Sequence, residues 1–262
     1  MATSDELLAL AVTAATDAGE LLLGALHMAR ATVNTKSTLT DMVTEMDHAS
    51  EALLRERLLG ARPQDGFLGE ETGETTGTSG VRWVCDPLDG TTNYIYAHPG
   101  FNVAVAAEDE QGALVGVVVD PLQSDVFTAT RGGGAHRNGA VITCSAKGAD
   151  DLATALCATG FAYDPVRRAR QAEVLARMLA GVRDIRRMGA AATDLCSVAC
   201  GRVDAYWERG LGPWDLAAGS LIAAEAGATV GDPADLGFVL AAPAGLFGPL
   251  RDLLVDAGAA EA

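Results

Sequence analysis

Two carboxylates and a glycine-led turn stand together at the end of an apolar strand pattern. Asp86 and Asp89 lie three positions apart, and Gly90 and Thr91 follow directly. Carboxylate oxygens suit hard cations such as Mg²⁺, which keeps several waters and is usually bound through a few carboxylates and substrate phosphate oxygens. The backbone N–H groups after Gly90 can point at the same phosphate. Because Asp-Gly alone is also a common turn, a metal site is favoured only together with acids from elsewhere in the chain.

A pair of adjacent glutamates follows a second, shorter apolar run. Successive side chains on an extended backbone point to opposite faces, so only one of Glu70 and Glu71 can aim at a given metal ion. We expect Glu70 to be the inward one, although such a pair is also typical of a solvated loop entry. The Gly/Thr-rich residues 73–80 that come next are interpreted either as a flexible flap over the metal or as a solvated connector.

Two further acids lie in the opening turns of predicted helices. Asp47 begins a helical pattern that runs to about Leu59, where the helix macrodipole alone would favour an acid. Asp215 follows Pro213, which suits the first helical position, in an apolar and small-residue helix that ends at Gly227. A carboxylate buried in such a helix needs a cation or a set of hydrogen-bond donors.

Together these segments resemble the inositol monophosphatase family of Mg²⁺-dependent, lithium-sensitive phosphatases, with agreement in order and spacing over nearly the whole chain. The matching residues are Lys36, 41–44, Asp47, 69–71, 86–93, 132–135, Asn138, Gly139, 204–208, Trp214 and Asp215. The resemblance implies an α/β (α+β) fold, the five-layer αβαβα sandwich of the inositol monophosphatase and fructose bisphosphatase type. It also implies one phosphatase unit over residues 1–262, with most metal ligands in an N-terminal half (1–150) and with Glu208 and Asp215 in a C-terminal half (151–262).

The resemblance also assigns metal ligands to particular residues. Glu70, Asp86 and the main-chain carbonyl of Leu88 look like ligands of a first Mg²⁺. Asp86, Asp89 and Asp215 look like ligands of a second, so that Asp86 bridges the two ions. A third, weaker ion beside Glu70 is implied by the same analogy. Two such cations can neutralise a phosphoryl oxygen, lower the pKa of a bound water and steady the departing alkoxide.

Catalytic and substrate-binding roles follow from the same resemblance. A metal-activated water would be held by Glu70 and the Thr91 hydroxyl, and Asp47 would orient that hydroxyl. Phosphate would meet the backbone amides of the glycine turn, and the alcohol part would meet acceptors from both halves. The implied substrate-binding residues are Asp89, Gly90, Thr91, Thr92, Ala191, Glu208 and Asp215. One departure is Ala190, where family members commonly carry Ser or Thr, so a hydroxyl contact to the substrate is expected to be missing.

The implied activity is Mg²⁺-dependent hydrolysis of a small phosphomonoester, with inositol 1-phosphate as the expected substrate. Histidinol phosphate is an alternative, as are fructose 1,6-bisphosphate and 3′-phosphoadenosine 5′-phosphate, although a bisphosphate would need an additional basic pocket. The alternative that is not an enzyme is a regulatory binding partner that retains the fold. A homodimer is expected from the resemblance and from the general prevalence of symmetric oligomers.

Composition narrows the class of partner. The formal net charge of −16 argues against a surface that follows nucleic-acid phosphates. The 5 cysteines show no paired metal spacing and the 4 histidines form no HxxxH pattern, so we expect reduced cysteines and no zinc site. The N-terminal residues lack a signal-peptide pattern, and no apolar run is expected to reach the length of a membrane span. A cytoplasmic protein without membrane or nucleic-acid partners is therefore predicted.

Periodicity predicts an N-terminal helix and then a mixture of strands and helices. A capping box at Thr3 and Glu6 begins a helix that runs to about Ala29. Strands are predicted over 81–86, 101–108, 113–120, 125–130, 203–208 and 238–241, with a hairpin turn at 111–112. Helices are predicted over 165–180, 190–200 and 213–226, with a final helix past Leu246.

Overall fold

The structure is a computed structural model that describes the chain apart from residues 1, 29–32, 36–41 and 145–150.

The first helix begins with the predicted capping box. At the start of α1 (Ser4–Ala25), the Glu6 N–H donates to Thr3 Oγ1 at 3.3 Å, and the Thr3 N–H donates to Glu6 Oε2 at 2.9 Å. These bonds use donors that have no partner within the helix. The helix ends at Ala25, and a short 3₁₀ turn (Leu26–Met28) continues it.

The prediction that no segment is long and apolar enough to span a membrane is wrong for α1. By length and mean hydropathy, this helix qualifies as a candidate span. Its buried residues, among them Leu7, Ala11 and Leu22, form one face that packs against the large sheet and α2 (Glu45–Ala61). A core helix of this kind passes the same test of composition, because alanine and leucine suit both environments.

The four predicted central strands belong to an eight-stranded sheet. The strand order is β10-β9-β8-β7-β6-β5-β3-β4, and every pair is antiparallel except β3 with β5. The strands are β3 (Gly66–Gly69), β4 (Gly73–Thr75), β5 (Arg82–Asp89), β6 (Asn102–Asp109), β7 (Gly112–Asp120), β8 (Asp125–Thr130), β9 (Gly134–Arg137) and β10 (Ala140–Ile142). A separate two-stranded sheet joins β1 (Val33–Thr35) to β2 (Met42–Thr44).

The Gly/Thr-rich stretch at 73–80 is a fixed edge of the large sheet. Its first three residues form β4, which pairs with β3. Farther along, the Thr78 N–H donates to the Gln64 carbonyl at 2.7 Å, and Ser79 Oγ donates to Asp65 Oδ1 at 2.6 Å. These bonds favour the connector interpretation over the flap.

The C-terminal elements build a second, five-stranded sheet in the order β12-β11-β13-β15-β14. Its strands are β11 (Leu156–Thr159), β12 (Asp184–Arg186), β13 (Ala205–Glu208), β14 (Thr229–Gly231) and β15 (Val239–Ala242). The helices of this region are α4 (Pro165–Met178), α5 (Ala191–Ala199), α6 (Pro213–Glu225), α7 (Pro233–Leu236) and α8 (Ala244–Ala257), with 3₁₀ turns at Leu152–Thr154 and Leu179–Gly181.

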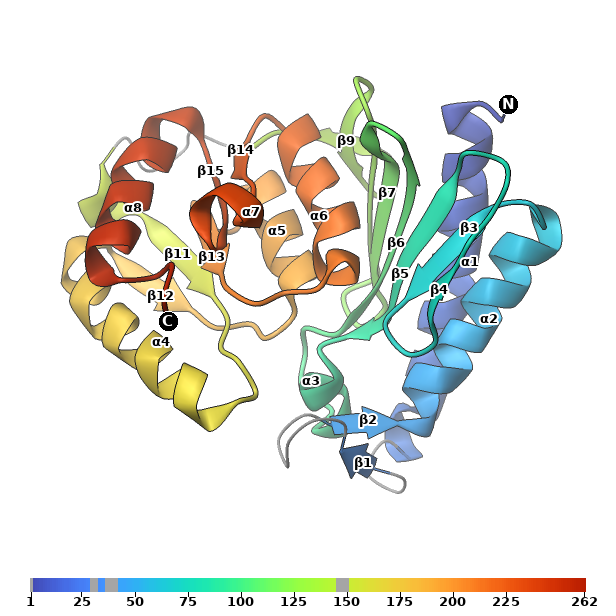
Figure 1. Cartoon of the computed structure of the whole chain (residues 1–262), viewed down its shortest axis with the longest axis horizontal. Helices are drawn as coiled ribbons and strands as arrows, with labels where there is room; N and C mark the ends of the chain where they lie inside the picture. Colours follow the sequence, from blue (N-terminus) through green and yellow to red (C-terminus); the bar gives the residue numbers. More distant parts are fainter. Residues whose placement is uncertain (1, 29–32, 36–41, 145–150) are drawn as a thin grey trace.

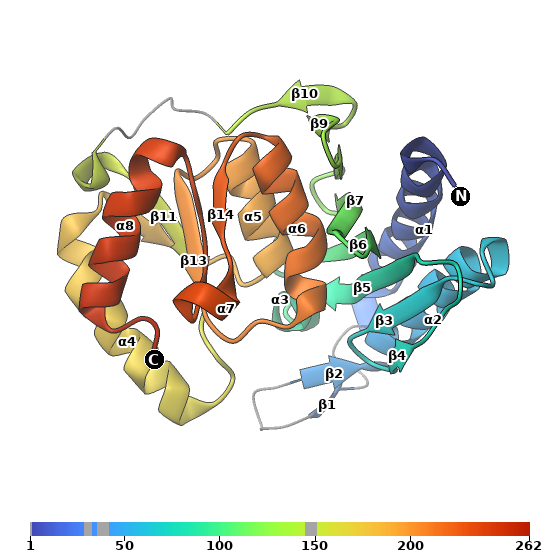
Figure 2. The same ribbon diagram turned by 45° about the horizontal axis from the view of Figure 1, so that its top comes forward.

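These elements stack as five layers, which confirms the predicted αβαβα sandwich. Helices α1 and α2 cover the outer face of the large sheet, whereas α5 and α6 lie between the two sheets (Figures 1 and 2). Helices α4 and α8 cover the far face of the smaller sheet (Figure 1). The division into halves at residue 150 stays a prediction, although the two sheets do come from 66–142 and 156–242.

Small residues let the central helices approach the sheet and each other closely. A Cβ at Gly116 of β7 would lie 2.8 Å from the Ala218 carbonyl oxygen of α6. A Cβ at Gly219 would lie 2.8 Å from a Leu195 methyl group of α5. Real Cβ atoms do not tolerate such contacts, so these glycines determine how deeply α6 is seated. Its first turn thereby reaches the end of β5.

Candidate metal and phosphate site

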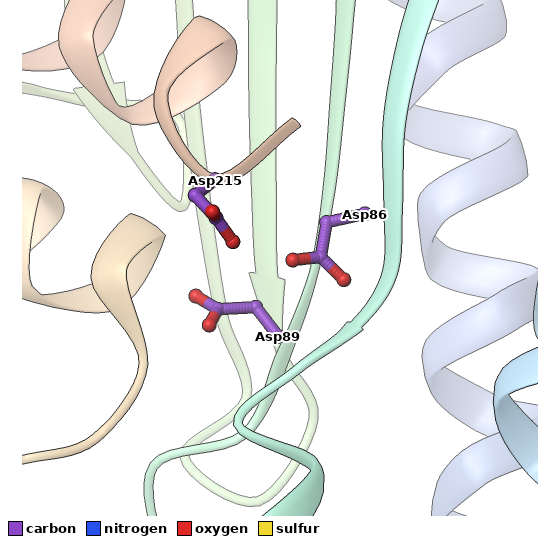
Figure 3. Close-up of side chains that lie close together, drawn as sticks. All are labelled: Asp86, Asp89 and Asp215. Carbon is purple, nitrogen blue, oxygen red and sulfur yellow. The ribbon is translucent and has the colours of Figure 1, made fainter. Parts of the chain in front are cut away.

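Three carboxylates from distant segments converge where β5 ends. Asp86 and Asp89 come from β5, and Asp215 comes from the first turn of α6 (Figure 3). One carboxylate oxygen from each residue lies within 4.8 Å of the other two. Residues i and i+3 of a regular strand would face opposite sides of the sheet. Here the pairing register with β6 shifts between Asp86 and Asp89, and the Leu88 N–H donates to Asp86 Oδ1 at 3.0 Å, so both acids face one cavity.

The electrostatics of this cluster favour a bound cation. Burial, followed by the charges of Glu70, Asp89 and Asp215, raises the pKa of Asp86 well above its ordinary 3.8. Burial and then the charge of Asp89 raise the pKa of Asp215 well above the same value. Buried carboxylates that repel one another are costly unless a cation compensates them. An all-oxygen acidic donor set fits a hard divalent ion such as Mg²⁺.

Asp89 is bound by donors from both halves of the molecule. Asn102 Nδ2 donates to Asp89 Oδ2 at 2.8 Å, and the Ala192 N–H donates to the same oxygen at 2.8 Å. The Ala191 N–H donates to Asp89 Oδ1 at 3.2 Å. Ala191 and Ala192 open α5, where backbone N–H groups have no partner within the helix. These donors oppose the rise that burial causes in the pKa of Asp89. The Ala191 amide, expected to meet the substrate, therefore contacts a predicted metal ligand.

The turn after Asp89 requires a glycine. Gly90 has a φ of 86°, in the left-handed region, and a Cβ there would lie 2.7 Å from the Gly100 carbonyl oxygen. The short helix α3 (Thr91–Ile95) follows, so the amides of Gly90, Thr91 and Thr92 stand at its start. The side chain of Thr92 shares a hydrogen bond with Tyr163.

Asp47 both caps α2 and reaches Thr91. Its Oδ2 accepts the Thr44 N–H at 2.8 Å and the Thr44 hydroxyl at 2.7 Å. Its Oδ1 accepts the Thr91 hydroxyl at 2.9 Å, and that hydroxyl also lies 3.1 Å from the Leu88 carbonyl oxygen. Asp47 is fully buried. The Asp47 carboxylate therefore has two contacts at once: one oxygen caps the start of α2, and the other accepts the Thr91 hydroxyl.

Glu70 reaches the cavity because a buried acid holds the turn that follows β3. Glu70 lines the same cavity as Asp86, Leu88 and Asp89. Glu71 faces the other way, where its carboxylate lies 3.7 Å from His48 Nδ1. The N–H groups of Glu71 and Thr72 donate to the two oxygens of Glu51 at 2.8 and 2.9 Å.

Two residues that support this site, Glu51 and Asn102, were not predicted from the sequence. Glu51 is fully buried in α2, although a helical glutamate carries no sequence signal of such a role. Asn102 is also fully buried and bridges Asp89 to Thr193 Oγ1, which it reaches at 2.8 Å. Both act through contacts that are remote in sequence, so spacing alone could not have identified them.

The cavity has a volume of about 440 Å³ and extends from the acids toward the smaller sheet. Ala190, Ala191 and Glu208 line it beside Asp215. The Tyr206 hydroxyl donates to Glu208 Oε2 at 2.7 Å, while burial raises the pKa of Glu208 to about 7. A carboxyl group of this kind can accept or donate a hydrogen bond near neutral pH.

A further buried acid, Asp194, lies near Glu208 and was not predicted. Asp194 of α5 is fully buried, and neither of its carboxylate oxygens has a hydrogen-bond partner among the described residues. Burial, followed by the charges of Glu208 and Asp89, raises the pKa of Asp194 well above 3.8. Lys36 and Asp41, which contributed to the resemblance, lie outside the described residues.

Comparison with known proteins adds an independent finding. A family model described as the inositol monophosphatase family matches residues 3–260. An inositol-1-monophosphatase of Mycobacterium leprae is 48% identical over 229 residues, which cover 82% of this chain and 78% of that protein. A Nus factor SuhB of Escherichia coli is 41% identical over 228 residues, covering 86% and 85%.

Solved structures agree with the fold. The structure of Mycobacterium tuberculosis SuhB matches with a TM-score of 0.86 and 38% identity, covering 100% of each chain. The extragenic suppressor protein suhB of Bartonella henselae matches with a TM-score of 0.89 and 35% identity, covering 95% of this chain and 98% of that one.

Proposed function

Because the chain belongs to the inositol monophosphatase family, we propose that it hydrolyses small phosphomonoesters with the help of Mg²⁺, and that inositol 1-phosphate is its substrate. One observation carries the proposal. Asp86, Asp89 and Asp215 bring carboxylate oxygens within 4.8 Å of one another, directly beside the left-handed turn at Gly90. A cation site next to a set of backbone N–H groups is an arrangement suited to a phosphate ester.

The donor set suggests which residues hold the metal. Glu70, Asp86 and the Leu88 carbonyl would hold a first Mg²⁺, and Asp86, Asp89 and Asp215 a second, with a third, weaker ion beside Glu70. When bound, Mg²⁺ supplies a water of lowered pKa and neutralises charge on the phosphoryl and leaving oxygens.

The protein's own groups position the reactants. Because the Thr91 hydroxyl donates to Asp47, its oxygen lone pairs are available to accept a hydrogen bond from water. The carboxylate of Glu70 lines the same cavity and can hold that water from another side. The amides of Gly90, Thr91 and Thr92 would bind phosphate oxygens. Such positioning carries most of the rate when the transition state is loose.

The far side of the cavity suits the alcohol part of the ester. Glu208 and Asp215 line this region and are acceptors for hydroxyl groups. Ala190 is 3% exposed and contributes only a methyl group there. We therefore propose that polyol recognition depends on Glu208 rather than on a hydroxyl at position 190.

Cell location and oligomeric state are part of the same proposal. All five cysteines are free thiols, three of them buried, which supports a reducing compartment such as the cytoplasm. A homodimer is proposed from the general prevalence of two-fold oligomers.

A second candidate function is a regulatory binding role. Relatives that are 40–41% identical carry the name Nus factor, which is not the name of a phosphatase. The buried carboxylate cluster favours the enzymatic function, because a binding scaffold would gain nothing from acids that repel one another.

A phosphate-release assay tests the proposal. The substrates are inositol 1-phosphate, histidinol phosphate, fructose 1,6-bisphosphate and 3′-phosphoadenosine 5′-phosphate, each with Mg²⁺ or with EDTA. We expect Mg²⁺-dependent turnover with inositol 1-phosphate preferred, and a loss of several orders of magnitude in Asp86→Asn with the fold retained by circular dichroism. Full activity in EDTA would refute the metal dependence, and a tenfold preference for histidinol phosphate would replace the substrate.

A further inference from the structure

Arginines gather at the α4 end of the catalytic cavity. Arg167 and Arg209 line the cavity that holds the acids. Together with Arg170 they also line an adjoining hollow of about 490 Å³. The two spaces share a wall formed by Arg167 and residues 208–211. In a chain of net charge −16, this is a local excess of positive charge beside a strongly acidic site.

The carboxylate that lines this hollow does not fully neutralise the arginines. Glu208 is the acid that lines the hollow, and burial raises its pKa to about 7, so near neutrality it carries only part of a charge. Asp164 caps α4, where its Oδ1 accepts the Arg167 N–H at 2.8 Å. Among the described residues, neither Arg167 nor Arg170 forms an ion pair.

The fold makes specific room for the Arg167 side chain. Gly210 has a φ of 87°, and a Cβ at that position would lie 2.0 Å from Arg167 Nη2. The same nitrogen lies 3.5 Å from the Arg209 carbonyl oxygen. Arg167 Nε is buried and has no hydrogen-bond partner among the described residues. The guanidinium is therefore fixed beside the cavity with a buried donor unused, and an anionic acceptor would relieve the cost of that unmade bond.

The other two nearby arginines are already committed. The Arg209 guanidinium donates to the Ala262 carbonyl. The charge of Arg187 acts on Asp89 and Glu208, where it opposes the rise that burial causes in the pKa of both carboxyl groups. Arg167 and Arg170 are thus the groups whose charge remains available to a ligand.

We propose that Arg167 and Arg170 form a subsite for a second anionic group, so that the enzyme accepts phosphomonoesters whose alcohol part carries another phosphate or a carboxylate. The inference rests on the proposed function, because the scissile phosphate is taken to lie at Gly90. Guanidinium groups present paired N–H donors that match phosphate and carboxylate oxygens. Neutral polyol hydroxyls would not need two cations in this position.

A kinetic comparison tests the subsite. The Arg167→Gln, Arg170→Gln double variant is assayed with inositol 1-phosphate, with fructose 1,6-bisphosphate and with 3-phosphoglycerate. The control is Arg251→Gln, since Arg251 lies on α8 and pairs with its neighbour Asp252. We expect kcat/KM for the doubly anionic esters, relative to inositol 1-phosphate, to fall about tenfold or more through KM in the double variant and to stay unchanged in the control.

The substrates also identify the second group. If the relative kcat/KM falls only for fructose 1,6-bisphosphate, the subsite binds phosphate. If it falls only for 3-phosphoglycerate, the subsite binds carboxylate. If both ratios in the double variant equal those of the wild type, the subsite does not exist.

A binding measurement separates this proposal from the catalytic one. In EDTA no cation draws anions to the acid cluster, so inorganic sulfate should bind at the arginines and raise the Tm of the wild-type protein. The double variant should lose this shift, and Arg251→Gln should keep it. A sulfate shift that depends on Arg167 and Arg170 in a chain without phosphatase activity would overturn the proposed function alone. If the wild-type enzyme is active but sulfate raises the Tm of the double variant just as much, the subsite alone is overturned.

Discussion

Replacing Glu51 with glutamine should weaken metal binding, although Glu51 is not itself a proposed ligand. The two oxygens of its buried carboxylate accept the N–H groups of Glu71 and Thr72 at 2.8 and 2.9 Å. Glutamine offers one carbonyl oxygen, and its amide NH₂ would face the other backbone donor. The substitution therefore removes one charge-assisted hydrogen bond and leaves a partly buried N–H unsatisfied.

The size of the effect follows from these two losses. A hydrogen bond to a charged group contributes about 1.5–3 kcal/mol, and an unsatisfied buried donor costs about 1–3 kcal/mol. The sum is about 2.5–6 kcal/mol, shared between lower stability and a rotated turn at Glu70. Since about 1.4 kcal/mol corresponds to a factor of ten in affinity, we expect a loss of roughly 10- to 100-fold in Mn²⁺ affinity together with a lower Tm.

The assay is a Mn²⁺ titration by calorimetry, beside a melting curve recorded in EDTA. Glu56→Gln is the matched control, because Glu56 is exposed on the same helix and loses the same charge. Wild-type Mn²⁺ affinity and an unchanged Tm in Glu51→Gln would refute the argument that this carboxylate positions Glu70.

Three further substitutions test other parts of the structure. Gly90→Ala should lose about 1–3 kcal/mol of unfolding free energy in urea, because the left-handed backbone and the Gly100 carbonyl leave no room for a methyl group. Asp47→Asn should lower kcat about tenfold or more while Mn²⁺ affinity stays within twofold, since Asp47 contacts the Thr91 hydroxyl but none of the proposed metal ligands. Asp194→Asn should be more stable than wild type at pH 7. Because the pKa of Asp194 is raised in the folded protein, wild-type stability falls as the pH rises above 3.8. Calorimetry should therefore show that the stability difference between Asp194→Asn and the wild type shrinks toward pH 4.

Local sequence patterns predicted the elements that have strong periodicity. The central strands of the large sheet begin and end within three residues of the predicted positions, because alternating apolar residues and turn glycines mark them. The same patterns gave no prediction for eight strands of only three or four residues, namely β1, β2, β4, β9, β10, β11, β12 and β14. Strands this short carry too few side chains to show a period, and tertiary pairing decides them.

The acids that could be named from the sequence belong to short motifs. Asp86, Asp89 and Asp215 stand beside Pro and Gly residues that mark the ends of elements, so their positions could be read locally. Asn102 and Glu51 could not, because their partners lie 91 residues and 20 residues away, respectively. α1 was misjudged for another reason: its alanines raise the mean hydropathy without forming a long unbroken apolar run.

The distribution of the acids along the chain has a consequence for biosynthesis. During translation Asp86 and Asp89 leave the ribosome well before α5 supplies the amides that bind Asp89, and Asp215 emerges later still. A nascent chain that has completed only the first sheet lacks one corner of the chelate and cannot trap a cation strongly. Tight metal uptake would then mark the moment at which the two sheets have docked, so it could serve as a readout of finished folding.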